Sequence, residues 1–164
     1  MANSVFISLG GNLGNTREIF KNVYVEIEKK VGPITKKSSI YQTAAWGPIP
    51  QPDFLNQVIK VATHLAAAET LALILSIEKN MGRIRTTKNA PRIIDIDILF
   101  FNNEIINQSD LIVPHPEIQN RRFVLTPLQE IAPQMIHPVL NKTIDQLLSQ
   151  CPDQLAVKKN IIPE

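Results

Sequence analysis

The sequence predicts an α+β fold: a ferredoxin-like βαββαβ sandwich with an added C-terminal hairpin and short helices. Two observations predict it. Stretches with the two-residue apolar period of strands and stretches with the helical period follow one another as strand, helix, strand, strand, helix, strand. The length of 164 residues allows one domain with a substantial core but not two, so we expect a single domain over residues 1–164.

The first strand and helix lie at the start of the chain. Val5–Leu9 is an apolar run that we interpret as a buried strand, and Gly10–Gly11 is expected to permit a tight turn. Asn15, with Glu18 three residues later, is typical of a helix N-cap. Apolar residues at helical spacing then run up to the stop signal Gly32, namely Phe20, Val23, Ile27 and Val31.

Two further strands and a second helix follow. Ile34–Tyr41 has strand character, and Phe54–Ala62 is the next strand-like run. The segment Thr43–Asp53 between them is too long for a tight hairpin turn, which indicates a functional loop. Ala67–Met81 is the second helix, with Gly82 as its stop.

The strand after the second helix carries two carboxylates on one face. Its alternation places Asp95, Asp97 and Leu99 on one side and an apolar set on the other, made of Ile94, Ile96, Ile98 and Phe100. The two acids stand about 6.5–7 Å apart along the strand. Like charges so close repel unless a cation lies between them, and paired carboxylates suit Mg²⁺. Two alternatives stay open: charge that protects an edge strand, or acids held by neighbouring arginines.

The C-terminal third is rich in proline. Asn102–Asn103 is a turn signal, and Glu104–Asn107 is an expected extra strand. We expect ordered loops rather than regular elements over Leu111–Pro138, because prolines cluster there. A short helix is expected at Thr143–Gln150, begun by Asn141 or Thr143.

Composition restricts the classes of function. A net charge of +2 is too weak to indicate a nucleic-acid surface. The single cysteine, Cys151, excludes an intramolecular disulfide framework and fits a reducing compartment. We see no signal peptide, and the longest apolar runs are strand-sized. We therefore expect a cytoplasmic monomer that binds small molecules and neither nucleic acid nor membrane.

Basic and aromatic residues could contribute to the same site as the acids. Guanidinium groups bind phosphate with two prongs, and five arginines lie near the acidic strand or in the tail: Arg83, Arg85, Arg92, Arg121 and Arg122. Phe54 and Asn56 share one strand face, where a ring could stack on a flat heterocycle and an amide could read its edge. The alternatives are solvated surface arginines, and core packing for Phe54 with a turn role for Asn56.

Two more residues gain interest from their neighbours. His115 lies in irregular chain within nine residues of Arg121 and Phe123, although a lone histidine is more often structural. Glu78 lies at the edge of the apolar face of the second helix, where it could accept hydrogen bonds from a ribose or base, or pair with Arg83. The glycine-rich segment 8–14 has neither the ending of a P-loop nor the spacing of a dinucleotide fingerprint.

Four motifs together resemble a known enzyme family. They are Gln51-Pro-Asp-Phe-Leu-Asn56, Pro91-Arg-x-x-Asp-x-Asp97, Pro114-His115 and Arg121-x-Phe-Val-Leu-x-Pro-Leu128. In this order they look like the signatures of 6-hydroxymethyl-7,8-dihydropterin pyrophosphokinase of folate synthesis. The resemblance runs from Ser8 to Pro133. It implies a ferredoxin-like domain that moves the pyrophosphoryl group of ATP onto the hydroxymethyl oxygen of the pterin and releases AMP.

The resemblance also implies roles for single residues. Asp95 and Asp97 would hold two Mg²⁺ ions that bridge ATP and the pterin hydroxyl. Phe54 and Phe123 would sandwich the pterin, whose polar edge would be read by Asn56, Thr43, Ala45 and Trp46. Arg83 and Arg92 would contact the transferring phosphates, and the nucleotide site would be lined by Glu78, Arg85, Arg92, Ile98, His115 and Arg121. One departure is that Asn89-Ala90 stands where many relatives have Trp-Gly, in a loop that closes over the substrates.

Two other functions fit parts of the pattern. RNA-binding modules share the strand-helix order, although carboxylates on a central strand would repel RNA. A two-metal nucleotidyltransferase could use the same acidic pair and would attack the α-phosphorus instead. Free pyrophosphate as product would indicate the nucleotidyltransferase, and AMP would indicate the pyrophosphokinase.

Overall fold

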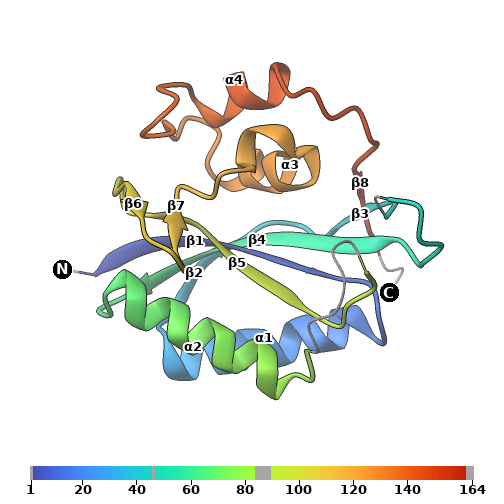
Figure 1. The fold of residues 1–164 in the computed structure, drawn as a ribbon, viewed down its shortest axis with the longest axis horizontal. Helices are drawn as coiled ribbons and strands as arrows, with labels where there is room; N and C mark the ends of the chain where they lie inside the picture. Colours follow the sequence, from blue (N-terminus) through green and yellow to red (C-terminus); the bar gives the residue numbers. More distant parts are fainter. Residues whose placement is uncertain (1, 46, 84–89, 162–164) are drawn as a thin grey trace.

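A computed structural model describes residues 2–45, 47–83 and 90–161. It is an α+β structure in which an antiparallel sheet has α1 and α2 on one face and α3 and α4 on the other (Figure 1). Its elements are β1 (Asn3–Gly11), α1 (Thr16–Lys30), β2 (Ile34–Lys37), β3 (Tyr41–Thr43), β4 (Phe54–Thr63), α2 (Ala67–Asn80), β5 (Asp95–Phe101), β6 (Ile106–Asn107), β7 (Ile112–Val113), the 3₁₀ turn η1 (Ile118–Asn120), α3 (Arg122–Ile131), α4 (Ile144–Ser149) and β8 (Lys158–Lys159).

The strand order places β1 and β4 at the centre of the sheet. The order is β5-β1-β4-β3-β8, and β2 also pairs with β4. The expected strand Ile34–Tyr41 is in fact two strands, so that prediction was wrong in its extent. The division falls at Ser38, whose hydroxyl accepts the Val58 N–H at 3.0 Å. A side chain thus replaces a backbone partner where the ladder would continue.

A β-bulge interrupts the regular alternation of β5. Phe6 stands opposite Phe100 and Ile7 opposite Ile98, so Leu99 is an extra residue between two paired positions. The extra residue turns Phe100 to the same face as Leu99, where it packs edge-on against Phe6. The prediction that Phe100 shares a face with Ile96 and Ile98 was therefore wrong.

Each face of the sheet has its own hydrophobic cluster. One fills the space under α1 and α2 and includes Phe20, Ile27, Ile74 and Ile96. The predicted N-cap of α1 is confirmed, because the Asn15 side chain accepts the Glu18 N–H at 3.2 Å. Apolar surface buried in this layer is the main stabilising contribution to the position of the helices.

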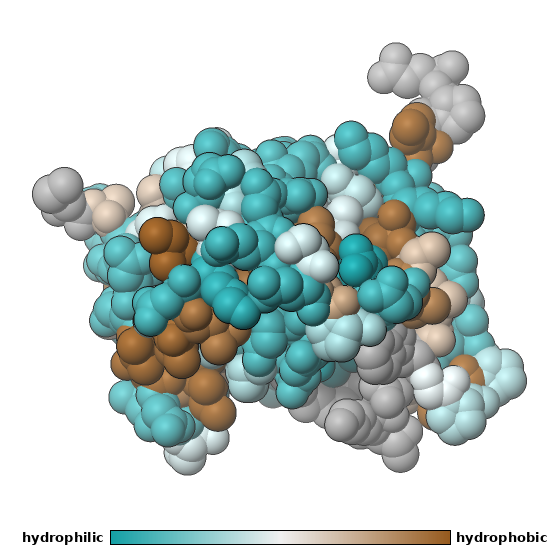
Figure 2. All heavy atoms as spheres, turned by 90° about the horizontal axis from the view of Figure 1, so that it is seen from above, coloured by the Kyte–Doolittle hydropathy of each residue, from teal (hydrophilic) through white to brown (hydrophobic). Residues whose placement is uncertain are grey.

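The second cluster lies under α3 and α4. α3 corrects the expectation of loops over Leu111–Pro138: the segment forms a helix despite Pro127, because Val124, Leu125 and Leu128 bury one face of it. Seen from this side, the surface is largely hydrophilic with separate hydrophobic patches (Figure 2). α4 begins at the predicted cap Thr143. In the described part of the chain, no helix has the length and apolar content needed to cross a bilayer.

Candidate active site

The register of the sheet brings distant residues into one row. Gly10 of β1 stands opposite Asn56 of β4 on one side and opposite Asp95 of β5 on the other. Directly opposed residues share a face, and neighbouring strands are about 4.8 Å apart. Asn56 and Asp95 therefore lie roughly 10 Å apart across a glycine that contributes no side chain. Asp97 lies on the same face, opposite Ser8.

The two glycines at the end of β1 allow close packing rather than a turn. A Cβ on Gly11 would lie 2.6 Å from the Ile93 carbonyl oxygen, and one on Gly10 would lie 3.1 Å from Asn56 Oδ1. Both residues still belong to β1, and the left-handed glycine of this connection is Gly14, with φ of 73°. The expectation that Gly10–Gly11 permits a tight turn was therefore wrong.

The acidic pair is electrostatically strained. Burial, the charge of Asp95 and the charge of Glu78 raise the pKa of Asp97 to about 7, and the opposing effects of Arg121 and Arg83 are smaller. Asp95 is paired with arginines, since its carboxylate lies 3.2 Å from Arg92 Nη1 and 3.7 Å from Arg83 Nη1. Arginines thus hold Asp95, as one of the two alternatives supposed. Asp97 lies beside negative charge, so a nearby cation would favour its ionised form.

The two arginines have donors to spare. Arg83 Nη1 also donates to the Ile94 carbonyl at 2.8 Å. In the described part of the chain, the Nε atoms of Arg83 and Arg92 are buried without a hydrogen-bond partner. A buried donor without a partner costs free energy, so these two Nε–H groups destabilise the protein as it stands. Guanidinium donors beside carboxylates are suited to an anion such as a polyphosphate.

Asn12 is a site residue that the sequence reasoning missed. Its side chain accepts the Arg92 backbone N–H at 2.9 Å and donates to Gln51 Oε1 at 2.8 Å and to the Pro52 carbonyl at 3.0 Å. Asn12 therefore ties the segment before β4 to the segment before β5. The only sequence signal was an asparagine directly after two glycines, and its partners lie about 40 and 80 positions away.

The candidate ring-binding residues come from three elements. Asn56 is buried and its amide donates to Thr43 Oγ1 at 3.1 Å. The Arg92 guanidinium lies 4.9 Å from the centre of the Phe54 ring. The Arg121 guanidinium lies 5.9 Å from the centre of the Phe123 ring at the start of α3. Each ring is thus within cation–π range of an arginine.

Glu78 of α2 and Ile98 of β5 both lie at the outer edge of the sheet. Glu78 is buried and its carboxylate accepts the Ile96 N–H at 2.7 Å, which satisfies the outer edge of β5. The Ile98 side chain packs under α1 and α2, away from the face of the acids. Only its backbone is therefore placed to meet a ligand on that face.

His115 is held as a neutral ring. Burial and the charge of Arg121 lower its pKa to about 4, and Nδ1 accepts the Glu117 N–H at 3.1 Å, which leaves Nε2 as the donor. Its backbone N–H donates at 3.0 Å to Leu99, the residue of the bulge. Arg122 has a structural task instead: its Nε donates to the Asp153 carbonyl at 2.7 Å.

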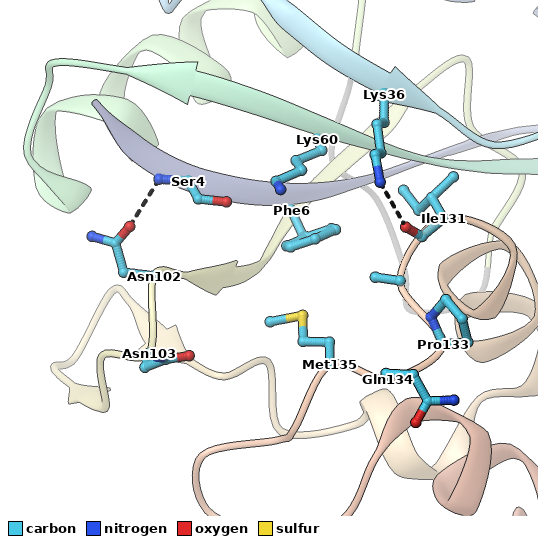
Figure 3. A pocket seen from close by; sticks show the side chains of 11 residues that line it. Ser4, Phe6, Lys36, Lys60, Asn102, Asn103, Ile131, Pro133, Gln134 and Met135 are labelled. Carbon is cyan, nitrogen blue, oxygen red and sulfur yellow. Dashed lines mark hydrogen bonds between the residues drawn. The ribbon is translucent and has the colours of Figure 1, made fainter. Parts of the chain in front are cut away.

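Three residues named from the sequence, Trp46, Arg85 and Asn89, lie outside the described residues. A hollow of about 500 Å³ lies elsewhere, at the end of β5 opposite to Asp95 (Figure 3). Phe6, Lys36, Lys60 and Met135 contribute to its lining, and Lys36 Nζ donates to the Ile131 carbonyl at 3.4 Å. None of the site residues expected from the sequence lines this hollow.

The fold and the site together define an α+β protein whose sheet face combines paired carboxylates with partly buried arginines. A sequence model of the 7,8-dihydro-6-hydroxymethylpterin-pyrophosphokinase (HPPK) family matches residues 6–133. The 2-amino-4-hydroxy-6-hydroxymethyldihydropteridine pyrophosphokinase of Synechocystis sp. is 39% identical over 145 residues, 88% of this chain and 74% of that protein. The protein of the same name from Aquifex aeolicus is 38% identical over 87% of this chain and 89% of its own length.

A solved structure shares the fold. The crystal structure of Plasmodium falciparum HPPK-DHPS matches with a TM-score of 0.76 at 20% identity, over 92% of this chain and 45% of that one. The chain belongs to the HPPK family.

Proposed function

We propose that this chain transfers the pyrophosphoryl group of ATP to the hydroxymethyl oxygen of 6-hydroxymethyl-7,8-dihydropterin, a step of folate synthesis. The oxygen attacks the β-phosphorus, the bond from this phosphorus to the α–β bridging oxygen breaks, and AMP leaves. The hydroxyl proton passes to solvent. Membership of the HPPK family supports this reaction. The observation that carries it is the row Asn56–Gly10–Asp95, in which the Asn56 amide and the Asp95 carboxylate are about two strand spacings apart. In the proposal, the amide reads the pterin and the carboxylate serves the phosphates.

The carboxylate pair fits two Mg²⁺ ions. Mg²⁺ commonly takes one or two protein carboxylates and completes its shell with water and substrate phosphates. The raised pKa of Asp97 comes mainly from burial and then from neighbouring negative charge, which a cation would offset. Bound Mg²⁺ would neutralise phosphate charge and acidify the attacking hydroxyl.

The protein's own residues bind and align the two substrates. Phe54 and Phe123 stack on the pterin, and its polar edge is read by Asn56, Thr43, Ala45 and Trp46. Arg83 and Arg92 contact the transferring phosphates through their guanidinium groups. The rest of the nucleotide site is formed by Glu78, Arg85, Ile98, His115 and Arg121. Alignment and charge stabilisation are the main requirements of phosphoryl transfer.

The proposal includes four further features: the fold type, the number of domains, the oligomeric state and the cellular location. The strand order β5-β1-β4 with β2 and β3 beyond it supports a ferredoxin-like arrangement. One domain over residues 1–164 and a monomeric state remain predictions. Cytoplasmic location also remains a prediction, supported by the free, buried Cys151.

Product analysis tests the reaction. The protein is incubated with ATP, Mg²⁺ and 6-hydroxymethyl-7,8-dihydropterin, and the nucleotides are separated by chromatography. We expect AMP and pterin diphosphate in equal amounts. Release of pyrophosphate would instead indicate a nucleotidyltransferase, and ADP would indicate ordinary phosphoryl transfer. A gel shift with RNA at physiological salt tests the binding-module alternative, and we expect no shift.

A further inference from the structure

The C-terminal tail adds β8 to the sheet as an outer strand beside β3. The segment 43–53, which we call the substrate loop, directly follows the first two residues of β3. β8 pairs with β3 in the register Tyr41 with Lys159 and Gln42 with Lys158, and the Asn160 N–H donates to the Ile40 carbonyl at 2.8 Å. These residues lie beyond 6–133, the segment that matches the family. β3 is three residues long, and its other hydrogen-bonded neighbour is β4. The tail therefore covers what would otherwise be a short edge strand.

The side chain of Asn160 is the junction between this tail and two other segments. Its Oδ1 accepts from Arg17 Nε at 3.0 Å and from Arg17 Nη2 at 2.7 Å, and Arg17 also donates to the Asn160 carbonyl. Its Nδ2 donates to Gln42 Oε1 at 2.8 Å. An arginine from the first turn of α1 thus fixes the orientation of the amide that holds Gln42.

Gln42 passes this constraint to the base of the substrate loop. Its Nε2 donates to Asp53 Oδ2 at 3.0 Å, so Gln42 and Asp53 join the two ends of the segment 43–53. The neighbour of Gln42 is Thr43, whose hydroxyl accepts from Asn56. Closing a loop at its base reduces the conformational entropy that the loop loses when a ligand binds.

We propose that Asn160, anchored by Arg17, is a positioning residue for the pterin, because it orders the strand end that carries Thr43 and Ala45. This inference rests on the proposed function, in which Thr43 and Ala45 read the pterin. Asn160 acts through Gln42. Its effect is therefore on pterin binding and not on ATP binding.

Three variants and one control test the proposal. Asn160→Ala removes the side-chain bonds to Arg17 and to Gln42 and keeps the bond from Arg17 to the backbone carbonyl. Asn160→Asp keeps the acceptor for Arg17 and places a charged carboxylate oxygen, which cannot donate, where the amide donor to Gln42 was. Gln42→Ala removes the same link from its other end, together with the bond from Gln42 to Asp53. Lys158→Ala, in the same strand with an exposed side chain, is the matched control because its backbone pairing is kept.

Four quantities are to be measured for each variant: the KM for the pterin at saturating ATP, the kcat, the Kd of a non-hydrolysable ATP analogue and the thermal unfolding midpoint. Asn160→Ala, Asn160→Asp and Gln42→Ala should each raise the pterin KM about 3- to 10-fold, the range expected for losing one net hydrogen bond. The ATP-analogue Kd and the values for Lys158→Ala should equal those of the wild type. The double variant of positions 42 and 160 should be no worse than the poorer single variant, because both changes break one link.

Two results would overturn the proposal. One is a wild-type pterin KM in Asn160→Asp, whatever happens to its thermal stability, because a merely structural tail would change stability alone. The other is additive losses in the double variant. These failures differ from failure of the proposed function, which would appear as an absence of AMP in the wild-type reaction itself.

Discussion

Replacing Asp97 with asparagine should stabilise the metal-free protein while abolishing turnover. The folded protein holds the pKa of Asp97 at about 7, against an ordinary value of 3.8. Between these pH values the native state binds a proton that the unfolded state has lost. The unfavourable contribution of Asp97 to stability therefore grows as pH rises from about 4 to about 7 and is constant above that. An asparagine side chain cannot ionise, so the Asp97→Asn variant lacks this contribution.

The magnitude follows from the same pKa values. The difference between 3.8 and 7 corresponds to an upper limit of about 4 kcal/mol at neutral pH, at 1.36 kcal/mol per unit. Asp97 keeps some contact with solvent, which reduces both the cost of its burial and the repulsion from Asp95 and Glu78. We expect Asp97→Asn to unfold with a free energy about 1–3 kcal/mol higher than the wild type at pH 7.5, and with nearly the same free energy at pH 4.

Urea unfolding in EDTA at the two pH values measures this difference, and AMP formation with Mg²⁺ measures activity in parallel. Asp110→Asn, an exposed acid elsewhere on the chain, is the control and should change neither quantity. A variant less stable than the wild type at pH 7.5, or a gain of equal size at pH 4, would refute the electrostatic reasoning. Near-normal AMP formation would refute the metal-binding role.

Three further substitutions test the site. Phe123→Ala should weaken pterin binding by about 1–3 kcal/mol, the scale of a base stacked on an aromatic ring, and unchanged affinity in a fluorescence titration would remove Phe123 from the site. Arg92→Lys keeps the charge but loses the planar fork, so kcat should fall about 100-fold or more in steady-state assays; a twofold change would argue against phosphate contact. Gly11→Ala would place a Cβ 2.6 Å from the Ile93 carbonyl oxygen, so urea unfolding should show a loss of about 1–3 kcal/mol, and a neutral result would contradict the close packing.

The regular elements could be predicted because their signals are local. The cap at Asn15 and the apolar spacing of α1 lie within one stretch of sequence, and the structure confirms both. The bulge at Leu99 could not be predicted, because it depends on how β5 pairs with β1. The helix α3 was missed because proline is a strong local signal against helix, and here the burial of Val124, Leu125 and Leu128 outweighs it.

The candidate site divides in the same way. Asp95 and Asp97 could be selected because two acids interrupt an otherwise apolar strand, which is a conflict visible in the sequence itself. The row that joins Asp95 to Asn56 through Gly10 depends on strand register, which only the folded sheet defines. Asn12 was overlooked for the same reason, since each of its side-chain partners is remote in sequence.

The central claim is that Asp95 and Asp97 together bind the divalent ions that accompany ATP. A crystal structure with Mn²⁺ and α,β-methylene-ATP tests it most directly, because the anomalous signal locates the metal without ambiguity. The account predicts metal peaks in contact with both carboxylates and with the phosphates, and Arg83 and Arg92 turned toward those phosphates. Metal and nucleotide bound elsewhere, with the acidic pair touching neither, would contradict it.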